Sequence, residues 1–127
     1  MENVSIIFDQ RLDIEFLQSI YEDDIEHAFM IFSQFLQMGP ALMKDIEESY
    51  SSGQVEPFRQ KVHKMKPVFS FVGLTHLTNK AEIIEKKCKV ISQIYDIDYL
   101  YQEFLTEYSN DFPIIENEVN RLKEQLN

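Results

Sequence analysis

The chain has 127 residues, the size of one domain, and its apolar fraction of 44% is ordinary for a soluble globular protein. Its net charge of −10 argues against a nucleic-acid-binding protein, because such proteins gain most of their affinity from Lys and Arg that neutralise phosphates. No apolar run approaches the roughly 20 residues of a membrane span, and residues 1–9 lack the basic and then apolar layout of a secretory signal. We therefore expect a single cytoplasmic domain over residues 1–127, with no nucleic-acid or membrane partner.

Apolar residues repeat at helical spacing along most of the chain, and three glycines and four prolines leave room for long helices. The first predicted helix, residues 13–21, is short and amphipathic. The second begins after Asp23 and Asp24, which offer an N-cap, and its pattern ends at residues 51–53. We expect a kink or a restart at Gly39–Pro40, since proline removes a helical hydrogen bond.

The third predicted helix begins near Gln54 and carries an apolar seam that continues until Gly73. The fourth has the same alternation over residues 74–88 and frays near Ser92. These two helices form a hairpin whose corner is Val72–Gly73.

The last predicted helix covers residues 98–126, with a kink or a new start at Pro113. Four substantial helices with one apolar stripe each can bury those stripes only against one another. No alternating strand pattern competes with this interpretation. The predicted fold is all-α: an antiparallel four-helix bundle with a short N-terminal helix.

Charge is distributed unevenly, since residues 58–89 contain eight of the 12 bases but two of the 22 acids. Such a segment is either a solvated face or a docking surface for an acidic partner. Inside it, one outward helix face carries Arg59, His63, Lys66, Pro67 and Ser70. The cations disfavour a second positive charge, so we expect His63 to be a neutral nucleophile. The same cations would stabilise a phosphoryl group attached to it.

Other chemistry is not indicated by the sequence. His27 and His76 form no repeated Glu-x-x-His pair, so no metal site is predicted. Phosphate-binding glycine loops, nucleophile elbows and H-E-x-x-H motifs are missing, so we expect neither an enzyme nor a bound cofactor. Cys88 stands alone in a helical stretch, where a thiol is usually a small buried apolar group.

A register of spaced positions extends from the histidine into the fourth predicted helix: His63, Met65, Lys66, Val72, Gly73, Leu77, Ala81 and Glu85. Over these 23 residues the chain resembles the histidine-containing phosphotransfer (HPt) domains of multistep phosphorelays. The similarity includes the family's H-x-(Leu/Met)-K opening and a glycine ten residues after the histidine. The order of helices before and after this run is also similar to that of the family.

The resemblance implies that His63 accepts a phosphoryl group from a receiver-domain aspartate of one response regulator and passes it to the aspartate of another. Lys66 would hold the phosphoryl oxygens, and Arg59, Pro67, Ser70 and Gly73 would form the partner-binding surface, with Gly73 also letting the hairpin helices approach. The implied partners are response-regulator receiver domains and a hybrid sensor histidine kinase. Mg²⁺ would come from the receiver, and a monomer is expected.

One residue departs from the family pattern, because Pro67 replaces the glycine that usually follows the lysine. We expect it to kink the third helix beside the histidine without blocking access. Two other functions remain open. A degenerate bundle would bind receivers or other acidic partners without phosphotransfer, and a metal-dependent bundle enzyme would need inward-facing His and Glu ligands.

Overall fold

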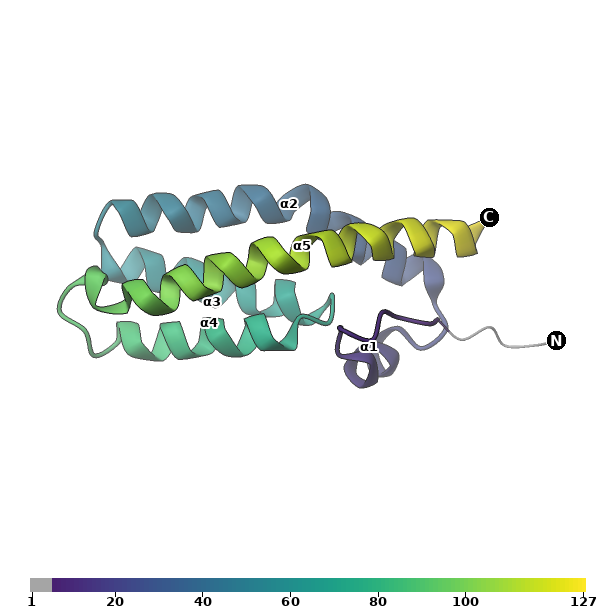
Figure 1. The fold of residues 1–127 in the computed structure, drawn as a ribbon, viewed down its shortest axis with the longest axis horizontal. Coiled ribbons are helices and arrows are strands. Elements are labelled where there is room, and N and C mark those ends of the chain that lie inside the picture. Colours follow the sequence, from purple (N-terminus) through teal and green to yellow (C-terminus); the bar gives the residue numbers. More distant parts are fainter. Residues whose placement is uncertain (1–5) are drawn as a thin grey trace.

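The computed structural model describes residues 6–127, which form five α-helices, one short 3-10 helix and no strand (Figure 1). The all-α class is therefore confirmed. Residues 1–5, the first part of the segment examined for a signal sequence, lie outside the described residues. Across residues 6–127, none of the helices combines the length and the apolar character that crossing a bilayer requires.

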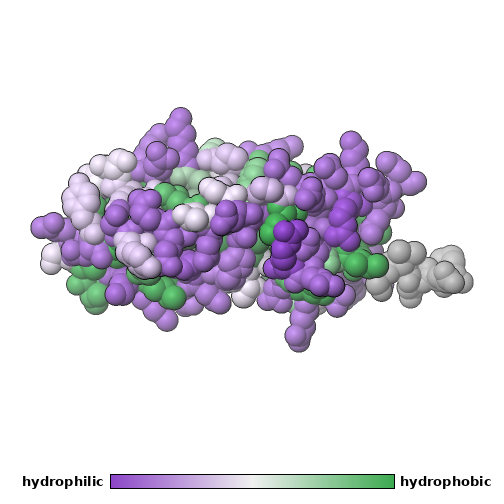
Figure 2. Space-filling model, viewed as in Figure 1, coloured by the Kyte–Doolittle hydropathy of each residue, from purple (hydrophilic) through white to green (hydrophobic). Residues whose placement is uncertain are grey.

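The helices in chain order are α1 (Ile14–Tyr21), α2 (Ile25–Ser51), α3 (Val55–Ser70), α4 (Thr75–Cys88), η1 (Ile94–Ile97) and α5 (Asp98–Leu126). Figure 1 shows α2 to α5 extending along one common direction, with α1 at the end where α3 turns into α4. α3 packs against α4 and α2, and α5 packs against α2 and α4. Hydrophilic residues dominate the face shown in Figure 2, as expected for helices that turn their apolar stripes inward.

Aspartate side chains cap the N-termini of the first two helices. The Asp13 carboxylate accepts a hydrogen bond from the backbone N–H of Phe16 at 3.2 Å, and Asp24 accepts one from His27 at 3.0 Å. Each bond satisfies a backbone donor that has no partner inside its helix. Of the two aspartates that the sequence offered for α2, Asp24 is therefore the N-cap.

The prolines interrupt no helix, so the restarts considered at Gly39–Pro40 and Pro113 do not occur. Gly39 is buried, and a Cβ atom built on it would lie 3.0 Å from the hydroxyl of Tyr108 in α5. Glycine at this position therefore lets α2 and α5 approach closely. α3 likewise runs past Pro67 to Ser70.

The corner between α3 and α4 is longer than the sequence predicts, since α3 ends three residues before Gly73. Gly73 has a φ of +78°, a left-handed conformation that favours glycine. Its carbonyl accepts a hydrogen bond from Asp13 at 2.9 Å, and a Cβ on Gly73 would lie 2.7 Å from Leu17 Cδ1. The chain preceding α2 therefore packs directly on the hairpin corner.

Two segments outside the predicted helices complete the core. Ile6, Phe8 and Leu12, before α1, are buried, and so are the two isoleucines of η1. The N-terminal segment is held to α5 by Glu118, whose buried carboxylate accepts the Asp9 N–H at 3.0 Å and pairs with Arg121. A polar side chain can be buried there because it has these partners.

Candidate functional site

His63 projects outward from the middle of α3, with 58% of its side chain exposed. Its Nδ1 lies 2.7 Å from Oε1 of Glu85, on the neighbouring helix α4. α3 and α4 pack against each other as a hairpin, so the contact joins two elements held by the core. The imidazole is therefore oriented by the fold while its ring remains accessible.

Glu85 is the centre of this site, although its side chain is only 10% exposed. Its Oε2 lies 2.7 Å from Nζ of Lys66, and its Oε1 lies 3.4 Å from Nη1 of Arg59 in addition to the His63 contact. Burial by itself would raise the pKa of Glu85, but the hydrogen bonds from Lys66 and His63 outweigh it and the pKa lies below its usual value. Glu85 is thus a carboxylate at neutral pH.

The ionised carboxylate decides which nitrogen of His63 carries the proton. A carboxylate can only accept hydrogen bonds, so Nδ1 must be the donor in this contact. In the neutral ring, Nε2 then holds the free lone pair, and it has no hydrogen bond to any residue between 6 and 127. A histidine with Nδ1 fixed by a carboxylate presents Nε2 as its nucleophilic atom.

The sequence placed His63 among cations, and the structure corrects this arrangement. Lys66 and Arg59 do lie near the histidine, but both are paired with Glu85, and Arg59 also forms two hydrogen bonds with Glu56. The charge in direct contact with the imidazole is therefore negative. A signal for this was present: Glu85 falls on the apolar stripe of α4, where an acid is buried only if it is paired.

Exposure to solvent differs among the remaining predicted site residues. Pro67 is exposed next to the site. The Ser70 hydroxyl lies 2.9 Å from that of Thr78 on α4, so this half-buried side chain is turned into the hairpin. Gly73 is buried under Leu17, so it presents little surface of its own to a partner.

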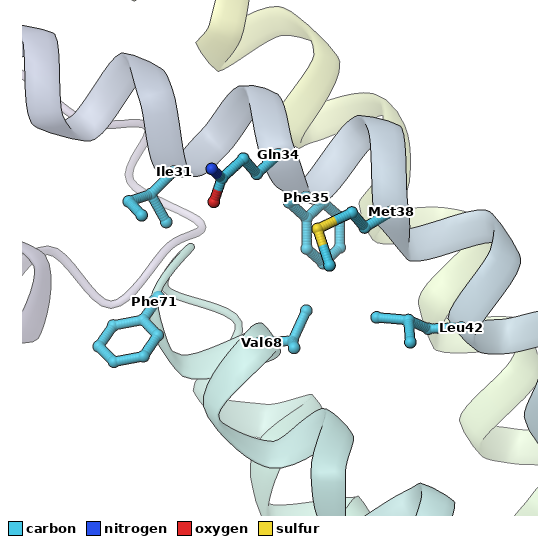
Figure 3. A pocket seen from close by; sticks show the side chains of 7 residues that line it. All are labelled: Ile31, Gln34, Phe35, Met38, Leu42, Val68 and Phe71. Carbon is cyan, nitrogen blue, oxygen red and sulfur yellow. The ribbon is translucent and has the colours of Figure 1, made fainter.

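An apolar hollow of about 140 Å³ lies between α2 and α3, close in sequence to Pro67. Figure 3 shows its side chains facing one another across the two helices: Ile31, Gln34, Phe35, Met38, Leu42, Val68 and Phe71. Met38 and Phe71 are 53% and 45% exposed. Large apolar side chains left open to solvent are typical of a protein-binding surface.

Two further candidate groups are metal ligands and the lone cysteine. Within residues 6–127 no group of three or more His, Cys, Asp or Glu side chains is placed to hold a metal ion. Cys88 is buried as predicted, and burial raises its pKa to about 11, which keeps it a thiol.

Comparisons with known proteins identify no relative of this chain. No protein-family model matches it, and neither a curated protein nor a solved structure does. The functional proposal is therefore based on the chemistry of the site around His63.

Proposed function

We propose that this protein is a phosphorelay intermediate of the HPt type, in which Nε2 of His63 accepts and donates the phosphoryl group. The supporting observation is an exposed imidazole whose Nδ1 lies 2.7 Å from a buried carboxylate. Such a contact fixes the tautomer and supports the positive charge that the ring acquires when Nε2 reacts. An exposed histidine without this partner would interconvert between tautomers.

The proposed step is a displacement at phosphorus. The Nε2 lone pair attacks the phosphoryl group of a receiver aspartyl phosphate, the N–P bond forms, and the P–O bond to the aspartate breaks to release a carboxylate. The Nδ1 proton stays in the hydrogen bond to Glu85, whose negative charge balances the positive ring. Onward transfer is the reverse step with a second receiver. Mg²⁺ and the aspartate belong to the receiver, so this chain supplies position and charge.

We assign Lys66 to the phosphoryl oxygens. Its ammonium group has three donors and forms an ion pair with Glu85 at 2.7 Å, which can engage at most some of them. The remaining donors, one helical turn from His63, suit the oxygens of an attached phosphoryl group. Pro67 follows without a long side chain, so an incoming receiver meets little obstruction there.

The arrangement suits an antiparallel four-helix bundle formed by α2 to α5, the architecture we propose for the domain. The helix pairs that contact one another are α2–α3, α3–α4, α4–α5 and α2–α5, which closes a ring of four. Packing in a closed bundle holds α3 in a fixed position. Such placement of the nucleophile is the main contribution that a small phosphotransfer protein makes to catalysis of the transfer. We propose a cytoplasmic monomer.

The hollow between α2 and α3 is the proposed docking site for receivers, including that of a hybrid sensor histidine kinase. Its lining residues Val68 and Phe71 come soon after Pro67 in the chain, at the C-terminal end of α3. An apolar centre with polar and charged residues around it is the usual composition of a protein interface. Docking there would bring the receiver's aspartyl phosphate toward Nε2.

The test is phosphotransfer from radiolabelled receiver domains of the same organism. We expect acid-labile, base-stable label on the wild-type chain and none on His63→Gln, because glutamine lacks the ring nucleophile. His76→Gln is the matched control, since His76 is also a partly exposed histidine on a helix of the hairpin. Label retained by His63→Gln would refute the proposal. Receiver binding without label, unaffected by His63→Ala, would instead indicate a binding module that performs no phosphotransfer.

A further inference from the structure

Arg59 contacts two carboxylates at the site. Its Nε and Nη2 reach the two carboxylate oxygens of Glu56 at 2.9 and 2.5 Å, which is a bidentate pair. Its Nη1 is directed at Oε1 of Glu85, 3.4 Å away. With 22% of its side chain exposed, the guanidinium is held between two acids and is not free in solvent.

Arg59 approaches the same carboxylate oxygen of Glu85 that accepts the hydrogen bond from His63. Oε1 of Glu85 accepts from His63 Nδ1 at 2.7 Å and also faces Arg59, whereas Lys66 contacts the other oxygen, Oε2. Arg59 and His63 therefore share one acceptor atom. A change in the charge near Oε1 directly alters the strength of the hydrogen bond that Nδ1 donates to it.

From this geometry we propose that Arg59, held in place by Glu56, is a positioning residue that sets how strongly Glu85 accepts from His63. The proposal rests on the proposed role of His63 as phosphoryl acceptor. It replaces the expectation from the sequence that Arg59 is a partner contact. Arg59 touches neither the phosphoryl group nor the receiver in this scheme, and acts through Glu85.

The physical effect follows from charge. A guanidinium beside Oε1 offsets part of the negative charge that would stabilise a protonated imidazole. His63 then keeps its Nε2 lone pair to lower pH, which favours nucleophilic attack. Without Arg59, Glu85 would act on His63 as a stronger base, and the ring would be protonated more readily.

Other charged groups lie around the cluster. On α3 they are Glu56 and Lys66, which pair with Arg59 and Glu85 respectively, and the exposed Lys64 beside His63. At the end of α4 is Lys89, whose charge acts on Glu56. None of these groups contacts Oε1 of Glu85, so Arg59 is the cation that shares this atom with His63 within residues 6–127.

The experiment follows the protonation of the His63 ring by NMR across pH, in the full chain and without any partner. In Arg59→Gln we expect the titration midpoint to rise by about half a unit, less than the roughly 1–3 units of a charge in direct contact, because Arg59 acts through Glu85 and the site is partly exposed. Arg59→Lys retains the charge and should move it less. The matched control is Lys64→Gln, which removes an exposed cation next to His63 and should leave the midpoint within about 0.2 unit because such a charge is screened.

A second readout is the rate at which phosphoramidate, a small phosphoryl donor, labels His63 as a function of pH. The pH of half-maximal rate should rise in Arg59→Gln together with the NMR midpoint. An NMR midpoint and a pH of half-maximal labelling that both stay unchanged in Arg59→Gln would overturn the proposal, and so would a midpoint that rises equally in Lys64→Gln. Because neither readout uses a receiver, failure of receiver phosphotransfer leaves this result readable.

Discussion

The substitution Gly73→Ala tests how the N-terminal segment is joined to the α3–α4 corner. Gly73 has a φ of +78°, and an alanine there would pay about 1–2 kcal/mol for the left-handed conformation. The new Cβ would also lie 2.7 Å from Leu17 Cδ1 and 3.1 Å from Leu12 Cβ, an overpacking that costs about 1–3 kcal/mol more. The expected loss of about 2–5 kcal/mol is a large part of the stability of a small domain, roughly 5–15 kcal/mol.

Urea unfolding of Gly73→Ala and of Gly53→Ala separates the two contributions. Gly53 has a nearly equal φ of +76°, but nothing lies within 4 Å of a Cβ built on it. The backbone cost therefore cancels between the variants, and Gly73→Ala should be less stable than Gly53→Ala by about 1–3 kcal/mol. Equal losses in the two variants would show that Leu12 and Leu17 do not pack against the corner as described.

Two further predictions concern the site and the hollow. Glu85→Gln should lower the free energy of unfolding by about 1–2 kcal/mol near neutral pH, because it weakens charge-assisted hydrogen bonds to partly exposed cations. The pKa of Glu85 lies below 4.5 in the folded chain, so its stabilising contribution is present above about pH 4.5 and is lost on acidification. Urea titrations should therefore show the unfolding free energies of the wild type and Glu85→Gln converging as the pH falls. A difference in unfolding free energy that does not depend on pH would contradict this. Val68→Glu places a charge in the apolar hollow and should weaken receiver binding about tenfold or more by calorimetry, while labelling of His63 by phosphoramidate stays unchanged. Unchanged receiver affinity would mean that receivers dock elsewhere.

The helices were predictable because each has to bury one apolar stripe, and the stripe's spacing is visible in the sequence. The prolines illustrate where this reasoning stops. Pro40 and Pro113 are local helix breakers, yet α2 and α5 continue through both, because packing along the rest of each long helix outweighs one lost hydrogen bond. A boundary inferred from a single residue is decided by the tertiary contacts around it.

The site was predictable in part. His63 and Lys66 were singled out from their shared face of α3 and from the resemblance of the spaced positions to the HPt family, since both are visible in the sequence. The apolar stripe of α4 indicates that Glu85 needs a partner, but it does not indicate His63, because the contact joins residues 22 positions apart on different helices and depends on the rotation of α4. The same limit applies to Gly73, which packs against Leu12 and Leu17. Apolar periodicity within the N-terminal segment does not indicate that these leucines contact the α3–α4 corner.

The most direct test of the account is to identify the atom that carries the phosphoryl group. The chain is phosphorylated by a receiver aspartyl phosphate, and the modified ring is examined by phosphorus and nitrogen NMR of nitrogen-15-labelled protein. We predict a phosphorus–nitrogen bond to Nε2 of His63, with the proton retained on Nδ1 toward Glu85. A phosphoryl group on Nδ1 or on another residue, or no modification by any receiver of the organism, would contradict the account.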